Sequence, residues 1–203
     1  MFSSPAVAYI LAFLALLNPF ALFLYLQPVM SALSRKDFLV VLLKASLISL
    51  AIFFIFSLSG TFLFEEVFRI HFESFRIFGG IIIFSQAFLF VVQGRLALLG
   101  MKESLDDLAS EIALPFFVGA GTISVSILIG SEFNASESLS ILSMILGINY
   151  ICIFVLLMFR QMFSKKLKVA FDKVMGIFLR LSGFFIGAVG LDMVVTGITR
   201  LFF

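Results

Sequence analysis

The sequence predicts an all-α membrane protein with six transmembrane helices in two inverted three-helix repeats, in which spans one and four are broken. Three observations lead to this fold class: the composition, the length of the charge-free runs, and a recurrence of motifs between the two halves. Hydrophobic residues make up 62% of the 203 residues and charged residues 13%, and the mean hydropathy is +1.21. Soluble domains carry about 25% charged residues. This chain has too few charges to coat a globule, so lipid must be its solvent.

Charge-free runs delimit the expected spans. A helix needs about 18–20 apolar residues to cross the ~30 Å hydrocarbon core. Runs close to or above this length are residues 1–34, 45–64, 77–94, 112–131 and 138–159, and a sixth run, 181–199, is interrupted only by Asp192. None alternates apolar and polar residues as barrel strands do. We therefore expect one transmembrane domain over 1–203.

The basic residues predict the orientation of the chain. Eleven of the 14 Lys and Arg residues fall in or beside the first, third and fifth inter-span loops, whereas Arg69, Arg76 and Arg200 lie on the opposite side. Short cytoplasmic loops carry an excess of Lys and Arg. This distribution places those three loops in the cytoplasm and both termini outside.

Two motifs recur in the same order in both halves. Arg76 with Gly79 and Gly80 opens span three, and Arg180 with Gly183 opens span six, 104 residues later. A Pro-Phe pair also begins at Pro19 and again at Pro115. These matches divide the chain into repeats 1–100 and 101–203. With three spans each, the second repeat would enter the membrane from the opposite side, a plan found in secondary transporters with a site near the midplane. Gene duplication in a structural protein is the alternative.

Spans one and four contain residues that break helices. Pro19 lacks a backbone N–H, and Asn18 can cap a half-helix that begins at Pro19. In span four, Pro115 is expected at the start and the flexible segment 119–122 in the middle. Free N–H groups at half-helix N-termini attract an anionic group such as a carboxylate, although each proline alone could be a harmless kink. The expected substrate-binding residues are Asn18, Pro19, Pro115, Gly119, Gly121 and Thr122.

Other polar residues narrow the function classes. Asp192 is the only acid deep in an expected span, where it could carry a coupling proton or remain protonated and hydrogen-bonded. Cys152 and His71 are the only residues of their kinds, so we expect no intrachain disulfide and no His-based metal site. Enzyme motifs such as GxSxG, HExxH and Walker A are missing from the sequence. We expect no enzyme activity, no cofactor, no metal and no nucleic-acid partner.

Taken together, the motif residues in spans one, three, four and six resemble the MarC family (UPF0056-type), which includes the SnatA-type neutral amino-acid transporters. The resemblance implies a multi-pass protein of the bacterial cytoplasmic (inner) membrane, and a carrier of small neutral amino acids such as glycine and alanine that is proton-coupled in some members. The family usually reads Gly-Pro-Gly in span four, where this chain has Ala120, and often carries Gln at the position of Asp192.

The leading hypothesis is therefore a secondary transporter of neutral amino acids that works by alternating access, with Arg76 and Arg180 organising the two openings. Two alternatives stay open. One is a structural or assembly membrane protein that packs through the GxxxG surface of Gly183 and Gly187, and the other is a passive channel. Besides the substrate, the expected partners are membrane lipid and further copies of the chain.

Overall fold

The computed structural model describes residues 4–60, 62–93, 109–110, 113 and 117–202, and throughout these ranges the ordered elements are helices. Five helical segments are long and apolar enough to cross a membrane: Ala6–Leu24, Arg35–Ser59, Phe72–Val92, Ala135–Met162 and Lys166–Phe202. A shorter apolar helix, Ala120–Glu132, lies where the fourth span is expected. At 1.5 Å per residue it is about 20 Å long, too short to cross the hydrocarbon core alone.

Within the described residues, the first half of the chain contains five α-helices and a short π-helix. They are α1 (Ser4–Leu17), α2 (Pro19–Tyr25), α3 (Gln27–Ala32), α4 (Arg35–Ser59), the π-helix η1 (Leu63–Val67) and α5 (Phe72–Gln93). The long helix α4 begins where the Ser34 hydroxyl accepts a hydrogen bond from the N–H of Asp37 at 3.2 Å, a standard N-cap. It ends at Gly60, whose φ of 52° favours glycine.

The second half holds α7 (Ala120–Glu132), α8 (Ala135–Met162) and α9 (Lys165–Phe202). The start of α8 is fixed by a capping box: the Asn134 side chain accepts from the N–H of Glu137, whose carboxylate accepts from the N–H of Asn134. Asn134 and Glu137 follow the capping pair Ser34 and Asp37 by 100 residues, so α4 and α8 start with the same device.

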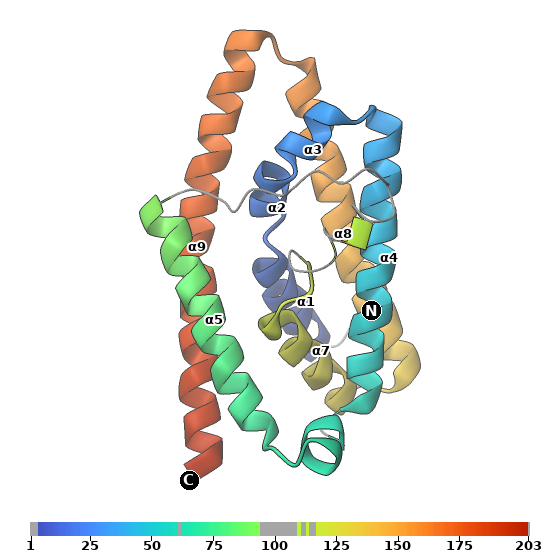
Figure 1. Ribbon diagram of the computed structural model, residues 1–203, viewed down its shortest axis with the longest axis vertical. Coiled ribbons are helices and arrows are strands. Elements are labelled where there is room, and N and C mark those ends of the chain that lie inside the picture. The colour runs from blue at the N-terminus through green and yellow to red at the C-terminus, as the bar shows by residue number, and fades with distance from the viewer. Residues whose placement is uncertain (1–3, 61, 94–108, 111–112, 114–116, 203) are drawn as a thin grey trace.

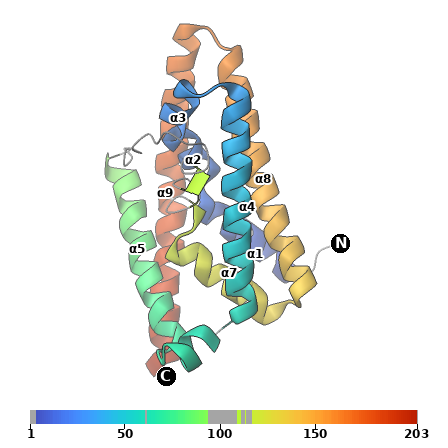
Figure 2. The same cartoon turned by 45° about the vertical axis from the view of Figure 1, so that its right-hand side comes forward.

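The helices form two packed groups. Helices α5 and α9 run antiparallel along one side, and Figures 1 and 2 show them side by side. Helices α1, α4, α7 and α8 pack together on the other side, with α2 between the groups. The turns between α3 and α4 and between α8 and α9 lie at one end of the molecule. The opposite end carries η1, the turn between α7 and α8, and the C-terminus (Figure 1).

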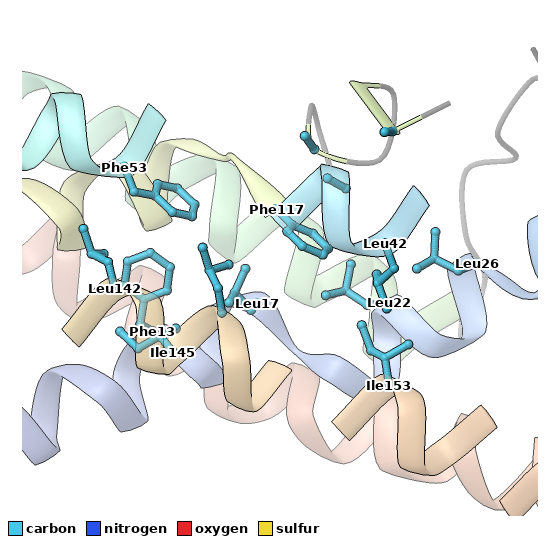
Figure 3. Close-up of a cluster of buried hydrophobic side chains, with 14 of the residues drawn as sticks. Phe13, Leu17, Leu22, Leu26, Leu42, Phe53, Phe117, Leu142, Ile145 and Ile153 are labelled. Atoms are coloured by element: carbon cyan, nitrogen blue, oxygen red, sulfur yellow. The ribbon is translucent and has the colours of Figure 1, made fainter. Parts of the chain in front are cut away.

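The core of the second group is a continuous set of large apolar side chains from α1, α2, α4 and α8 (Figure 3). Phe13 meets Phe53 edge to face at a centroid distance of 5.0 Å, and both side chains are fully buried. Farther along the core, Leu22 and Phe117 come from the two segments that border the helix breaks. Because lipid tails are as apolar as these side chains, close packing holds the helices together, with little help from the hydrophobic effect.

The buried positions of the two halves follow a common pattern. In α4 they are Phe38, Val41, Leu42, Ala45, Ser46, Ser49, Phe53 and Ser57, and in α8 they are Ser138, Ile141, Leu142, Ile145, Leu146, Asn149, Ile153 and Leu157. Every position of the second set follows its counterpart by 100 residues. The buried positions of α5 are Phe72, Arg76, Gly79, Gly80, Ile83, Ala87 and Phe90. Each of them except Gly79 is followed 103 residues later by a buried position of α9: Met175, Leu179, Gly183, Ile186, Gly190 and Met193.

This burial pattern differs by one residue from the 104-residue spacing of the Arg-x-x-Gly motifs. It pairs Gly80 with Gly183, and Arg76 with Leu179 instead of Arg180. The start of α9 explains why the motif misleads. The helix begins at Lys165, so Arg180 lies well inside it with an exposed side chain, and the expectation that Arg180 stands at a helix N-terminal end is wrong. The charge-free run 181–199 covers only the part of α9 that is apolar enough to face lipid, and the helix itself begins 16 residues earlier.

Candidate binding cavity

The first helix break lies at Asn18, as the sequence predicts. Helix α1 ends at Leu17, α2 begins at Pro19, and Asn18 between them has φ 46° and ψ 78°, a left-handed conformation that asparagine tolerates better than most residues. The N–H of Ala21, which would bond to the Leu17 carbonyl in an unbroken helix, instead donates to Asn18 Oδ1 at 3.2 Å. The last carbonyls of α1 are thereby released from the helical ladder.

The Asn18 side chain also joins the two groups of helices. Its Nδ2 donates to Ser182 Oγ on α9 at 2.7 Å, and the Ser182 hydroxyl donates to the carbonyl of Leu179 at 2.9 Å. Asn18 is buried, and a buried amide without partners is costly in an apolar surrounding. Both ends of this amide are satisfied, so the break is a fixed feature of the fold.

The second break lies just before α7. Gly119 is extended, with φ −123° and ψ 169°, and α7 begins at Ala120. The Thr122 hydroxyl lies 2.9 Å from the N–H of Gly119, from which it accepts, and 3.0 Å from the carbonyl of Phe117. The sequence suggested that the segment 119–122 lies in the middle of span four. In the structure this segment instead starts the helix α7. Pro115, expected to begin span four, lies outside the described residues.

The two breaks converge on one cavity of about 70 Å³, well above the ~10–15 Å³ needed for one water molecule. Its lining comes from both helix groups: Leu16, Leu17, Asn18, Ala21, Leu22, Phe117, Gly119, Ala120, Gly121 and Thr122 on one side, and Ile82, Ile83, Gln86, Phe90 and Ile186 on the other. Among these lining residues none carries a charged side chain. The polar side chains at the cavity are Asn18, Gln86 and Thr122.

Three helix ends meet at this cavity. The C-terminal end of α1 contributes Leu16 and Leu17, while the N-terminal ends of α2 and α7 contribute Ala21 and Gly121. A helix C-terminus has free carbonyls and a partial negative charge, and a helix N-terminus has free N–H groups and a partial positive charge. The cavity thus offers acceptors on one wall and donors on another without a formal charge on either.

The other predicted site residues that the structure describes do not line the cavity, and some of them hold its walls together. A Cβ at Gly79 would lie 3.2 Å from the Ala120 Cβ, so α5 packs closely on the start of α7. Gly80 and Gly183 lie at the contact between α5 and α9.

Arg76 is buried near the start of α5, where its Nη1 pairs with Glu73 Oε2 at 3.0 Å. Pro19 is the first residue of α2, and Asp192 is exposed on α9 and does not line the cavity.

Two groups of residues were not found by sequence reasoning. The first group is Ile83 and Phe90, which line the cavity but are apolar residues like many others in the sequence, so that only their helical spacing from Gly79 could have indicated their position.

The second group is a polar cluster where α8 and α9 approach their connecting turn. Arg160 binds the Asp172 carboxylate through Nε and Nη2, each at 2.9 Å, and Gln27 Nε2 donates to Asp172 at 3.0 Å. This cluster joins α9 to α8 and α3.

Sequence similarity to known proteins extends over most of the chain. The sequence model of MarC family integral membrane proteins matches residues 4–202. A UPF0056 membrane protein of Aquifex aeolicus is 27% identical over 94% of this chain and 91% of its own. Another UPF0056 membrane protein, from Pyrococcus horikoshii, is 22% identical over 82% of each chain. No solved structure matches the chain. Because the family match covers nearly every residue, the chain belongs to the MarC family of integral membrane proteins.

Proposed function

We propose that this protein is a secondary transporter of small neutral amino acids that works by alternating access. The observation that supports this best is the single cavity at which both broken helices meet, between two separately packed helix groups. If Asn18, Gln86 and Thr122 served only to join helices in a structural protein, they would have no reason to border the same cavity. Discontinuous helices whose ends face a common site are typical of secondary transporters.

The charge distribution of the cavity fits a zwitterion. The carboxylate of an amino acid would accept from the N–H groups at the start of α7, and its ammonium group would donate to the carbonyls released at the end of α1. The lining residues carry no formal charge, so a solute with net charge would enter uncompensated, at a high cost in desolvation. A solute whose charges cancel meets this requirement. The apolar residues beside the helix ends favour a neutral side chain.

The architecture supports alternating access. The burial pattern that recurs after 100 residues in α8 and after 103 residues in α9 supports two inverted repeats, as the motifs predict. We propose that α5 and α9 move as one body against the other helices, because their mutual contact is far more extensive than their contacts with the rest. The loops rich in Lys and Arg would face the cytoplasm of a bacterial cell, with both termini outside.

The test is uptake of labelled alanine or glycine by proteoliposomes that contain the purified protein, with empty liposomes as the control. We expect saturable uptake and exchange of internal for external substrate. Repeating the assay with and without a proton gradient shows whether transport is proton-coupled. The proposal fails if folded, monodisperse protein moves none of the small neutral amino acids under any gradient.

The cluster around Asp172 would act as the closure at its end of the molecule. Asp172→Asn removes the charge that both Arg160 bonds use, so we expect that end to open more often, by about 2- to 5-fold, the range of a partly exposed ion pair. The measurement uses Gln86→Cys in a Cys152→Ser background, which leaves one cysteine beside the cavity. An impermeant maleimide should label this cysteine faster in Asp172→Asn than in the parent protein when it is added on the side of the membrane that faces the Asp172 cluster, and at an unchanged rate when it is added on the other side.

A matched control is Lys173→Gln, which removes a neighbouring exposed charge outside the Arg160 cluster. We expect it to leave the labelling rate unchanged. Equal acceleration by both variants would show a general electrostatic effect, and no acceleration by Asp172→Asn would show that the cluster is not a closure.

A further inference from the structure

Ile83 is held between two glycines from different helices. A Cβ on Gly121 would collide with Ile83 Cδ1, so this methyl group lies directly against the first turn of α7. On its other side, Ile83 Cγ2 lies 3.1 Å from the position of a Cβ on Gly190 of α9. The two branches of one β-branched side chain are therefore fixed by two separate backbones. Because β-branched residues also have few allowed χ1 rotamers, Ile83 forms a rigid wall.

This wall stands beside the part of the cavity where a carboxylate would bind. Ile83 and Gly121 both line the cavity, and the N–H groups at the start of α7 belong to the same turn as Gly121. In an α-amino acid, the side chain leaves the carbon atom next to the carboxyl group. A substrate whose carboxylate binds at α7 therefore holds its side chain within reach of Ile83.

We propose that Ile83 sets the upper size limit of the transported solute. The inference rests on the proposed function and adds to it the residue that selects among substrates. Gly121 and Gly190 take part by allowing the isoleucine to lie against the backbone, which keeps its Cδ1 in place. Phe90 also lines the cavity and lies against one glycine, with its Cβ 3.3 Å from the position of a Cβ on Gly183, whereas Ile83 is held by glycines of two different helices.

The test compares alanine and leucine uptake by wild-type protein and by Ile83→Ala in proteoliposomes. Ile83→Ala removes the wall, and we expect the ratio of leucine to alanine uptake to rise at least ~10-fold, since one methylene group in an apolar pocket changes selectivity about 10- to 200-fold. Ile83→Val, which lacks only the Cδ1 methyl, should give an intermediate ratio. This milder variant keeps the test decisive if the alanine variant does not fold.

The control is Ile81→Ala, which removes the same atoms from the outward face of the same helix, where Ile81 is 49% exposed. Its uptake ratio should equal that of the wild type. If wild-type protein transports alanine and neither Ile83 variant changes the ratio, the role of Ile83 is refuted while the transport function stands. If wild-type protein transports no neutral amino acid, the proposed function itself is refuted.

Discussion

Gly80→Val will separate α5 from α9 and leave little folded protein. A Cβ at Gly80 would lie 2.6 Å from the carbonyl oxygen of Gly190 and 3.0 Å from the backbone nitrogen of Val194. These are backbone atoms, which cannot rotate away as a side chain can. The helices must therefore move apart along their whole contact, and we expect a cost of at least about 3 kcal/mol, the upper end of ordinary overpacking. The measurement is the thermal stability of purified protein in detergent, followed by size-exclusion chromatography.

Two glycines in open surroundings provide the control. Gly176 in α9 and Gly147 in α8 have no atom within 4 Å of an added Cβ. Because alanine is the better helix former by about 1 kcal/mol, Gly176→Ala and Gly147→Ala should be neutral or slightly stabilising. If Gly80→Val melts at the same temperature as these two variants, close packing between α5 and α9 is not needed for the stability of the fold.

Gly121→Ala will block transport while the fold persists. The added methyl group would occupy the place of Ile83 Cδ1, and Gly190 on the other side prevents the isoleucine from retreating. The side chain must then turn into the cavity, so we expect alanine uptake to fall by at least ~10-fold. Adding Ile83→Ala to Gly121→Ala should restore uptake, because the double variant has room for the new methyl group. Such non-additivity is the signature of two residues in contact.

Gly176→Ala is the control for this double-variant experiment. Gly176 lies in α9 outside the cavity lining and shows no atom within 4 Å of an added Cβ. We expect its uptake to match that of the wild type. If Gly121→Ala and Gly176→Ala behave alike, or if Ile83→Ala gives no rescue, the close contact does not shape the cavity.

The sequence could predict the break at Asn18 because its cause is local. Pro19 has no N–H to continue α1, and Asn18 has the side chain that caps a new helix, whatever surrounds them. The start of α7 was harder to place. Proline is the stronger local signal, so Pro115 was expected to begin the span, but Pro115 lies outside the described residues. Among the residues that are described, α7 begins at Ala120, where the Thr122 hydroxyl accepts from the N–H of Gly119. A threonine in such a position is also common inside membrane helices.

Contacts between distant helices were beyond the reach of the sequence. Ile83 looks like any lipid-facing isoleucine until α7 and α9 are placed around it. The pairing of Arg160 with Asp172 was hidden for another reason: both residues were assigned to a loop or its border, whereas they lie on α8 and α9. The repeat was recognised through residue types, but the residues that face inward follow a spacing one residue shorter. Identical residue types need not occupy equivalent sides of a helix.

The length of α9 determines how deep the cavity lies in the bilayer. The helix has 38 residues and is about 57 Å long, so it extends beyond the hydrocarbon at one or both ends. Arg180 and Arg200 are both exposed and stand about 30 Å apart along its axis, close to the thickness of the hydrocarbon core. When both charges reach the headgroups, Gly190, which lies against Ile83, stands halfway between the two leaflets. We therefore expect α9 to hold this side of the cavity equally far from both aqueous phases.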